Sequence, residues 1–407
     1  MKNLRLRKPN CTPFPPRRSI AIAGGALAIL VLVGCSGTPP VAGTSAGICP
    51  VDITFSAATV VVAATATSAE PAVALPPALR SRLRSQAVKG VPTCIAIVTP
   101  QGKLIALDVT PRRPNGAVEN GPNRDRKVEQ NLDVVASRLS TLAATGPGLD
   151  PLTVIDRAVG LHPTPGMMIV ITSGVATETP TDLRTLGWDL DATEAAARLG
   201  RAGDIPSLIG WRVQFVGIGD VAGRQPPLKP ALRQRLQNWW LAICRVGGAI
   251  NCASPRGTIS TSAPVSRNAV PVVPLPTPVV AGARIEIPNA LLFAINSAVV
   301  ERGAEQSLGL VVERALRTGE SVRVTGYTDA ITGSAGHNRQ LSQRRADAVG
   351  AQLVRLGLPD AQLQSPKGFG SQGASVDREK ADPAQVSRDR RVEITFSTVG
   401  RTLVPRE

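Results

Sequence analysis

The sequence has few aromatic residues and only two histidines, and these shortages exclude several classes of protein. Aromatic side chains make up 3% of the 407 residues, so Ala, Val, Leu and Ile must build most of the cores. His162 and His337 are far apart and there is no C-x-x-C, which argues against a metal site. A G-x-S-x-G nucleophile elbow is absent, since residues 368–373 read GFGSQG. We therefore expect neither an enzyme nor a bound cofactor.

The chain also lacks an apolar run of about 20 residues, the length that a membrane-spanning helix needs. Its longest apolar run lies within residues 19–34 and follows a basic, acid-free segment, a pattern typical of an export signal. The run ends in Leu-Val-Gly-Cys, which resembles the lipobox of bacterial lipoproteins. That resemblance implies that residues 1–34 are a signal peptide and that Cys35 is lipidated. A buried cysteine at the end of an uncleaved anchor is the alternative.

Negative charge is in short supply: 46 basic residues face 30 acidic ones, a net charge of +16. Part of the excess leaves with the signal peptide. Outside the cytoplasm, a basic surface meets anionic wall polymers or lipid headgroups rather than nucleic acid. A merely solvated basic surface is the alternative.

Six cysteines are present, and four of them remain after Cys11 and Cys35 are set aside. An even number in an oxidising compartment predicts two disulfides, with three possible pairings among Cys49, Cys94, Cys244 and Cys252. We favour Cys244–Cys252, which closes a short loop. Cys49–Cys94 would then tie the N-terminal tether to the first domain.

Composition divides the exported chain into four parts. Residues 35–55 are rich in Gly, Thr, Ser and Pro and predict a flexible tether. Residues 56–250 alternate apolar strand-like runs with helical patterns, which predicts an α/β domain with a mostly parallel, doubly wound sheet. Residues 251–282 are Pro-, Ser- and Thr-rich and predict an extended linker. Residues 283–407 read strand, helix, strand, helix, strand, strand.

The elements that we expect in the first domain follow from these runs. The expected strands are 59–66, 93–99, 103–109, 167–173 and 211–219, and the expected helices are 129–143, 151–161, 192–201 and 230–245. In the last domain we expect strands at 284–293, 321–327, 363–369 and 391–397, with helices at 300–317 and 338–357.

One stretch of the last domain combines opposite charges. Asn338, Leu341 and Arg345 are spaced i, i+3 and i+7 and so share one face of the expected helix 338–357. Asp329 ends the preceding strand, at the edge where α/β sheets bind ligands. Arg345 would attract a carboxylate and Asp329 an ammonium, so the spacing predicts a site for an amino acid head group. A salt bridge between Asp329 and Arg345 that holds the loop is the alternative.

The same stretch, VRVTGYTDAITGSAGHNRQLSQRRADAVGAQLV, closely resembles the signature of the OmpA-like (OmpA/MotB C-terminal) domain. The resemblance extends over about 284–397 and includes FAINS, GFGS and DRRVEI. It implies an α/β sandwich that binds peptidoglycan non-covalently through the diaminopimelate of the stem peptide. It also implies roles for seven residues: Asp329 for the ammonium, Arg345 for the carboxylate, and Asn338, Thr328, Leu341, Asn296 and Arg390 around them.

The sequence departs from the family pattern at several positions. Tyr327 replaces the usual histidine, Ala294 and Asp389 replace an aspartate and an asparagine, and one extra residue separates Asp329 from Asn338. The two charged anchors are retained.

The first domain resembles a von Willebrand factor A domain in GMMIVITSGVATETPTDL and WRVQFVGIGDV. Its metal motif, D-x-S-x-S, is replaced by residues without aspartate, so the resemblance implies protein binding or spacing rather than metal-dependent adhesion. An unassigned α/β domain is the alternative.

Together these features predict a lipid-anchored envelope protein that tethers a membrane to the cell wall. The anchor would lie in the outer membrane or on the outer face of the cytoplasmic membrane. The main alternative is an envelope scaffold or adhesin whose first domain binds a protein partner. A flagellar-stator role would need an acidic membrane-spanning helix, and residues 19–34 contain no acidic residue.

Overall fold

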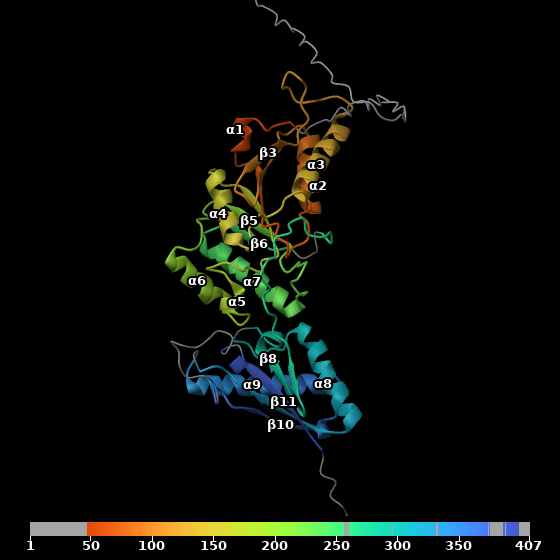
Figure 1. Ribbon diagram of the computed structural model, residues 1–407, viewed down its shortest axis with the longest axis vertical. Helices are drawn as coiled ribbons and strands as arrows, with labels where there is room; N and C mark the ends of the chain where they lie inside the picture. Colours follow the sequence, from red (N-terminus) through yellow and green to blue (C-terminus); the bar gives the residue numbers. More distant parts are fainter. Residues whose placement is uncertain are drawn as a thin grey trace, which may run out of the picture. The chain divides into compact units, whose positions relative to one another are not determined.

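The computed structural model describes residues 47–255, 260–294, 296–330, 333–372, 374, 386 and 388–398, which form two separate sheets (Figure 1). The predicted signal peptide, Cys35 and most of the predicted tether lie outside these residues. Within the described ranges, no helix is long and apolar enough to cross a membrane.

The first sheet has six strands in the order β3-β2-β1-β4-β5-β6. All neighbouring strands are parallel except the β2–β3 hairpin. The strands are β1 (Val60–Ala64), β2 (Cys94–Val98), β3 (Leu104–Asp108), β4 (Met167–Ile171), β5 (Arg212–Val216) and β6 (Asn251–Ala253). The sheet is therefore mostly parallel, as expected for a doubly wound fold.

Helices cover both faces of this sheet, which explains why the central strands β1 and β4 and the neighbouring β2 are apolar throughout. Val60 and Val62 of β1 pack with α2 (Pro77–Val88) and α3 (Arg124–Ser140), which lie side by side in Figure 1. Val61 belongs to the core on the opposite face. That core includes residues of α4 (Pro151–Leu161), α6 (Ala192–Ala202) and α7 (Pro230–Val246), while α1 (Val51–Thr54) and α5 (Leu183–Leu186) are single turns.

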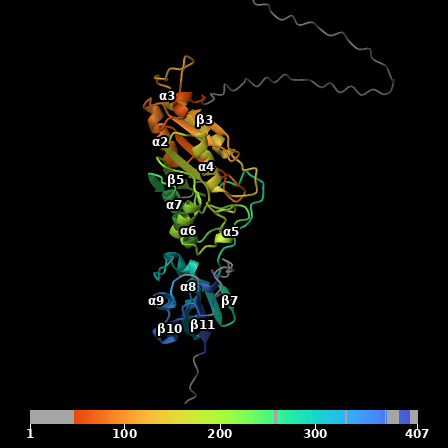
Figure 2. The same ribbon diagram turned by 90° about the vertical axis from the view of Figure 1, so that its left-hand side faces the viewer.

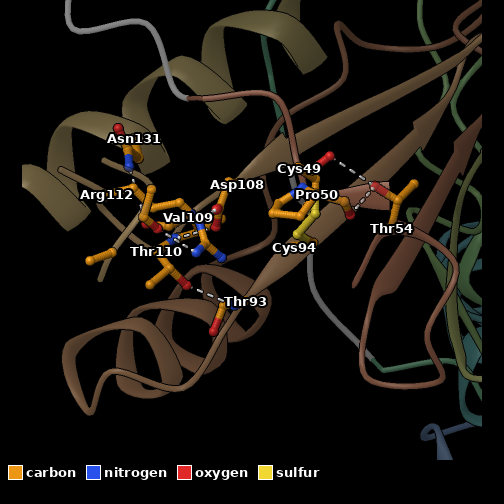
Figure 3. Close-up of polar contacts among 12 residues, drawn as sticks. Cys49, Pro50, Thr54, Thr93, Cys94, Asp108, Val109, Thr110, Arg112 and Asn131 are labelled. Carbon is orange, nitrogen blue, oxygen red and sulfur yellow. Dashed lines mark hydrogen bonds and ion pairs between the residues drawn. A yellow bond between two sulfur atoms is a disulfide. The ribbon is translucent and has the colours of Figure 1, made fainter. Parts of the chain in front are cut away.

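Both favoured disulfides are present. Cys49 and Cys94 have Cα atoms 6.1 Å apart, and Cys244 and Cys252 have Cα atoms 6.0 Å apart. Figure 3 shows the first of these, beside Thr54, whose hydroxyl donates to the Cys49 carbonyl at 3.2 Å. The end of the predicted tether is thus folded: Cys49 is buried, and α1 follows it.

The second sheet has five strands in the order β10-β9-β11-β8-β7, and only the β9–β10 pair is parallel. Its elements are β7 (Val279–Ala281), β8 (Arg284–Pro288), the short 3₁₀ helices η1 (Asn289–Leu291) and η2 (Arg302–Ala304), α8 (Glu305–Thr318), β9 (Ser321–Gly326), α9 (Ala335–Arg355), η3 (Asp360–Gln362), β10 (Leu363–Gly368) and β11 (Arg391–Ser397).

One face of the second sheet is apolar and the other is polar, unlike the first sheet. Val322 and Val324 of β9 belong to one core with Leu308 of α8 and Val349 of α9, whereas Arg323 between them is exposed. Figure 2 shows α8 and α9 with β10 and β11 in this part of the chain. The predicted two-layer α/β arrangement is confirmed.

The predicted linker is shorter than expected and is packed against the first domain. Its first residues form β6, and residues 279–281 form β7, because each segment finds a sheet edge to pair with. Between them, Val273 is buried and exchanges two hydrogen bonds with the Gln225 side chain, at 2.8 and 3.0 Å. The predicted linker is therefore hydrogen-bonded to the first domain over part of its length, and residues 261–278 have neither helix nor strand.

Candidate functional site

The loop after β9 carries Thr328 and Asp329. β9 lies between β10 and β11, so its end is fixed from both sides: the Tyr327 N–H donates to the Arg391 carbonyl at 2.9 Å, and the Thr328 N–H donates to the Gly370 carbonyl at 2.8 Å. Asp329 is 2% exposed. A buried carboxylate at this edge is costly unless it has partners, which marks the loop as a candidate site.

The N-terminal half of α9 supplies the facing residues. The helix begins three residues earlier than expected, where the Ser334 hydroxyl accepts from the His337 N–H at 3.2 Å as an N-cap. Asn338, Leu341 and Arg345 are all buried on this helix. The Asn338 side chain donates to the Asp329 carbonyl at 3.1 Å, so it holds the loop against the helix.

Arg345 is a buried cation in this part of the domain, and the carboxylates of Asp189 and Asp329 favour its charged form. Its Nε donates to the Ser297 carbonyl at 2.9 Å, and its guanidinium lies 5.2 Å from the Phe293 ring centre. Burial lowers the pKa of Arg345 to about 10, since desolvation disfavours the charged form. A carboxylate beside Arg345 would offset that cost.

Asp329 is paired with Arg390 in this structure. Arg390 Nε lies 2.6 Å from Asp329 Oδ2. The neighbouring Arg391 has a different role, because it stacks over the Tyr327 ring at 4.3 Å and pairs with Glu393 at 2.7 Å. The two adjacent arginines are therefore divided, one in the cleft and one supporting the sheet.

All seven residues that the family resemblance implies line one cleft: Asn296, Thr328, Asp329, Asn338, Leu341, Arg345 and Arg390. Asn296 is exposed and has a φ of 52°, in the left-handed region. Across the described ranges, no group of three or more His, Cys, Asp or Glu residues is placed to hold a metal ion.

Two buried polar atoms in this cleft lack hydrogen-bond partners among the described residues, namely Thr328 Oγ1 and Asn289 Oδ1. Such orphaned groups are rare in folded proteins and cost about 1–3 kcal/mol each, so a group that bonds to them would offset that cost. Sequence reasoning missed Asn289. It predicted a strand through residue 293, but the strand ends at Pro288 and Asn289 begins η1. The proline was the signal that could have found this boundary.

Comparison with known proteins identifies this part of the chain. Residues 292–389 match the model described as the OmpA family, so the C-terminal part of the chain is an OmpA-like domain. The family comprises structural envelope proteins, so the prediction of a non-enzymatic function is confirmed for this part of the chain. The resemblance of the first domain to a von Willebrand factor A domain stays a prediction.

Individual relatives cover different shares of the chain. Outer membrane protein 40 of Porphyromonas gingivalis is 38% identical over 75 residues, 18% of this chain and 20% of that protein. Outer membrane protein A of Citrobacter freundii is 28% identical over 225 residues, 51% of this chain and 93% of that protein. The chain thus spans only a fifth of the first of these relatives. The peptidoglycan-associated lipoprotein from Burkholderia pseudomallei is a solved structure 25% identical to this chain. It covers 26% of this chain and 88% of its own, with a TM-score of 0.23.

Proposed function

We propose that the OmpA-like domain binds peptidoglycan non-covalently by gripping the diaminopimelate of the stem peptide. The observation that carries the proposal is the buried pair of opposite charges, Asp329 and Arg345, in one cleft beside two orphaned polar atoms. The free end of diaminopimelate carries an ammonium and a carboxylate. Arg345 would bind the carboxylate and Asp329 the ammonium.

The remaining cleft residues would orient this head group. The Thr328 hydroxyl and the Asn289 carbonyl oxygen would gain the partners that they lack. Leu341, 5% exposed, would contact the methylene chain of the ligand. Arg390 would have to share Asp329 with the incoming ammonium, since its Nε already lies 2.6 Å from that carboxylate.

The expected affinity is modest. Charge-assisted hydrogen bonds contribute about 1.5–3 kcal/mol each. After the cost of association, two anchored ends correspond to a Kd of roughly millimolar to micromolar. A lipid anchor beside a polymer of repeating ligands would add avidity, so weak single contacts suffice for a tether.

Co-sedimentation of the full chain, purified in detergent, with diaminopimelate-containing cell wall tests this proposal. Asp329→Ala and Arg345→Ala should each lower binding at least about tenfold, because each removes one charged anchor. Arg355→Ala is the matched control: it removes the same charge from an exposed position at the other end of α9 and should bind normally. Cell wall with lysine in place of diaminopimelate lacks the carboxylate and should bind weakly. Equal binding by all three variants would contradict the clamp.

We also infer that Cys35 carries the lipid that holds the protein in the envelope. The basic N-terminal segment, the short apolar run and the Leu-Val-Gly-Cys sequence support this inference. Cys35→Ala should prevent lipidation. The protein should then either leave the membrane fraction for the soluble fraction or keep its uncleaved signal peptide. Unchanged membrane association of a cleaved Cys35→Ala protein would contradict a lipid anchor.

A second candidate function is an envelope scaffold that acts through the first domain. The observation that favours it is a complete α/β domain with its own two disulfides, which a simple spacer does not need. Deletion of residues 56–250 discriminates the two functions. Loss of a co-purifying partner with unchanged wall binding would support the scaffold, and no change in either would support a spacer.

A further inference from the structure

The first domain has a crevice at the point where its chain reverses direction across the sheet. β1 lies between β2 and β4, and the loops that leave the ends of β1 and β4 go to opposite sides. Such switch points are the ordinary ligand positions of doubly wound sheets. Here the crevice is lined by residues of both loops, including Ala66, Glu70, Thr172 and Ser173.

Five hydrogen bonds converge on the Glu70 carboxylate in this crevice. Oε1 accepts from the Thr65 hydroxyl at 2.6 Å, the Thr172 hydroxyl at 3.0 Å and the Ser173 N–H at 2.7 Å. Oε2 accepts from the Thr67 N–H at 3.0 Å and the Thr67 hydroxyl at 2.8 Å. Glu70 is 4% exposed. The donors come from both loops and leave each carboxylate oxygen well satisfied.

The two loops that supply these donors contain residues with left-handed backbone conformations. Ala66 has a φ of 48°, in the left-handed region that a residue with a side chain rarely adopts. Gly174, with a φ of 71°, follows Ser173 and lies so close to Trp240 that an added Cβ would be 2.4 Å from the indole nitrogen. Unusual backbone at a sheet edge is typical of binding loops.

The segment 260–274, called the strap below, is hydrogen-bonded to the loop that carries Glu70, and its Ser260 lines the crevice. The Ala72 N–H donates to the Ser262 carbonyl at 3.2 Å, and the Ser68 hydroxyl donates to the Asn268 carbonyl at 2.5 Å. The loop that carries Glu70 is therefore held on both sides of this residue. An external ligand can reach the donors only if the Glu70 side chain is absent or withdrawn.

We infer that this crevice is a carboxylate-binding site that the chain occupies with its own Glu70. Two groups of donors, three on one oxygen and two on the other, match a planar two-oxygen anion better than a tetrahedral phosphate. The site is separate from the wall-binding cleft and does not depend on the proposed function. The partner of the first domain would therefore present a carboxylate, which would displace Glu70 when the strap opens.

Removing the Glu70 carboxylate by mutation and adding a free carboxylate to the solution tests this inference directly. Glu70→Ala removes a CH₂ and a carboxylate, and acetate supplies the same groups. We would follow thermal unfolding of the full chain by tryptophan fluorescence at pH 7, in acetate and in chloride of equal ionic strength. Glu70→Ala should lower Tm by roughly 5–10 °C in chloride, since five donors lose their acceptor. Acetate, saturating at about 10–100 mM, should restore at least half of that loss and leave the wild type unchanged.

Glu70→Gln and phosphate are the matched controls. The glutamine side chain still fills the crevice but turns an NH₂ group toward the donors, so Tm should fall and acetate should have no effect. Phosphate should not stabilise Glu70→Ala more than the wild type. Equal acetate effects on the wild type and Glu70→Ala would overturn the inference. If Glu70→Ala does not fold, Glu70→Gln decides: wild-type stability of that variant would also overturn it.

Discussion

The two domains place polar loops at the edge of an α/β sheet, but they satisfy them differently. In the first domain the Glu70 carboxylate accepts five hydrogen bonds, and all five donors belong to that domain. In the OmpA-like domain, Thr328 Oγ1 and Asn289 Oδ1 have no partner among the described residues. Because a buried polar group is costly when unpaired, we expect the Glu70 edge to stabilise the fold, and we propose that a ligand completes the edge of the OmpA-like domain.

This difference in hydrogen bonding should separate two properties of the protein: the stability of the fold should depend on the edge around Glu70, and wall binding should depend on the edge around Asp329 and Thr328. Polar residues of similar burial should have opposite effects when they are replaced: those at the first edge should change the free energy of unfolding, and those at the second should change wall binding. The tryptophans help to keep the two readouts apart, because all four lie in the first domain, between positions 188 and 240.

The largest expected effect comes from the disulfides, both of which lie in the first domain. Cys49→Ser/Cys94→Ser opens a link across 45 residues and should lower the free energy of unfolding by about 4 kcal/mol. Cys244→Ser/Cys252→Ser opens a link across 8 residues and should cost about 2.5 kcal/mol. Denaturant titration followed by tryptophan fluorescence measures both. Wall binding should not change, and a parallel loss of binding would show that the second edge depends on the first domain.

The next effect concerns a single hydroxyl at the first edge. Thr172 Oγ1 donates to Glu70 and accepts from the Gly174 N–H at 3.0 Å. Thr172→Val keeps the shape but removes one of the three donors to Glu70 Oε1 and leaves the Gly174 N–H without an acceptor, so it should lower the free energy of unfolding by about 1–3 kcal/mol. Urea titration measures the change. An unaltered midpoint would mean that the two hydrogen bonds of this hydroxyl contribute nothing to stability.

The same substitution at the second edge sharpens the comparison. Thr328 is 4% exposed, as buried as Thr172, but its hydroxyl is unpartnered. Thr328→Val should leave the free energy of unfolding within about 0.5 kcal/mol or raise it. Wall binding should weaken roughly fivefold, as one ligand hydrogen bond is lost. If Thr328→Val lowered the free energy of unfolding and left wall binding unchanged, the Thr328 hydroxyl would serve the fold rather than the ligand.

The sequence predicted the regular elements well where apolar periodicity was strong. The expected helix 151–161 is observed with the same bounds, and the five expected strands of the first sheet are all present. It missed α2, whose residues Pro77–Val88 are rich in arginine and show little apolar periodicity. It also missed β6, since a three-residue strand is too short to carry a pattern.

The two edges differ in how far the sequence could predict them. The cleft of the OmpA-like domain was accessible because five of its seven predicted residues lie in a local, recognisable motif between Thr328 and Arg345. Glu70 belongs to no motif, and its donors come from two loops about 100 residues apart in sequence. Their meeting depends on the strand order β2-β1-β4, which composition and periodicity do not specify.

The smallest expected effect lies outside both edges, at the surface pair of Glu119 and Lys127. The hydrogen bond from Lys127, with Nζ 2.7 Å from Oε2, and that from the Gly121 N–H lower the pKa of Glu119 to about 2. A carboxyl group with a lowered folded-state pKa contributes stability above its unfolded pKa, and this contribution is lost as pH falls toward 2. The wild type should therefore be slightly more stable than Glu119→Gln at pH 7, and the gap should narrow below about pH 4.5. Urea titrations of both proteins between pH 7 and pH 3 measure it. A stability difference that widened on acidification would contradict the lowered pKa of Glu119. A difference at pH 7 as large as the loss caused by Thr172→Val would mean that this surface pair stabilises the fold as much as the buried hydroxyl does.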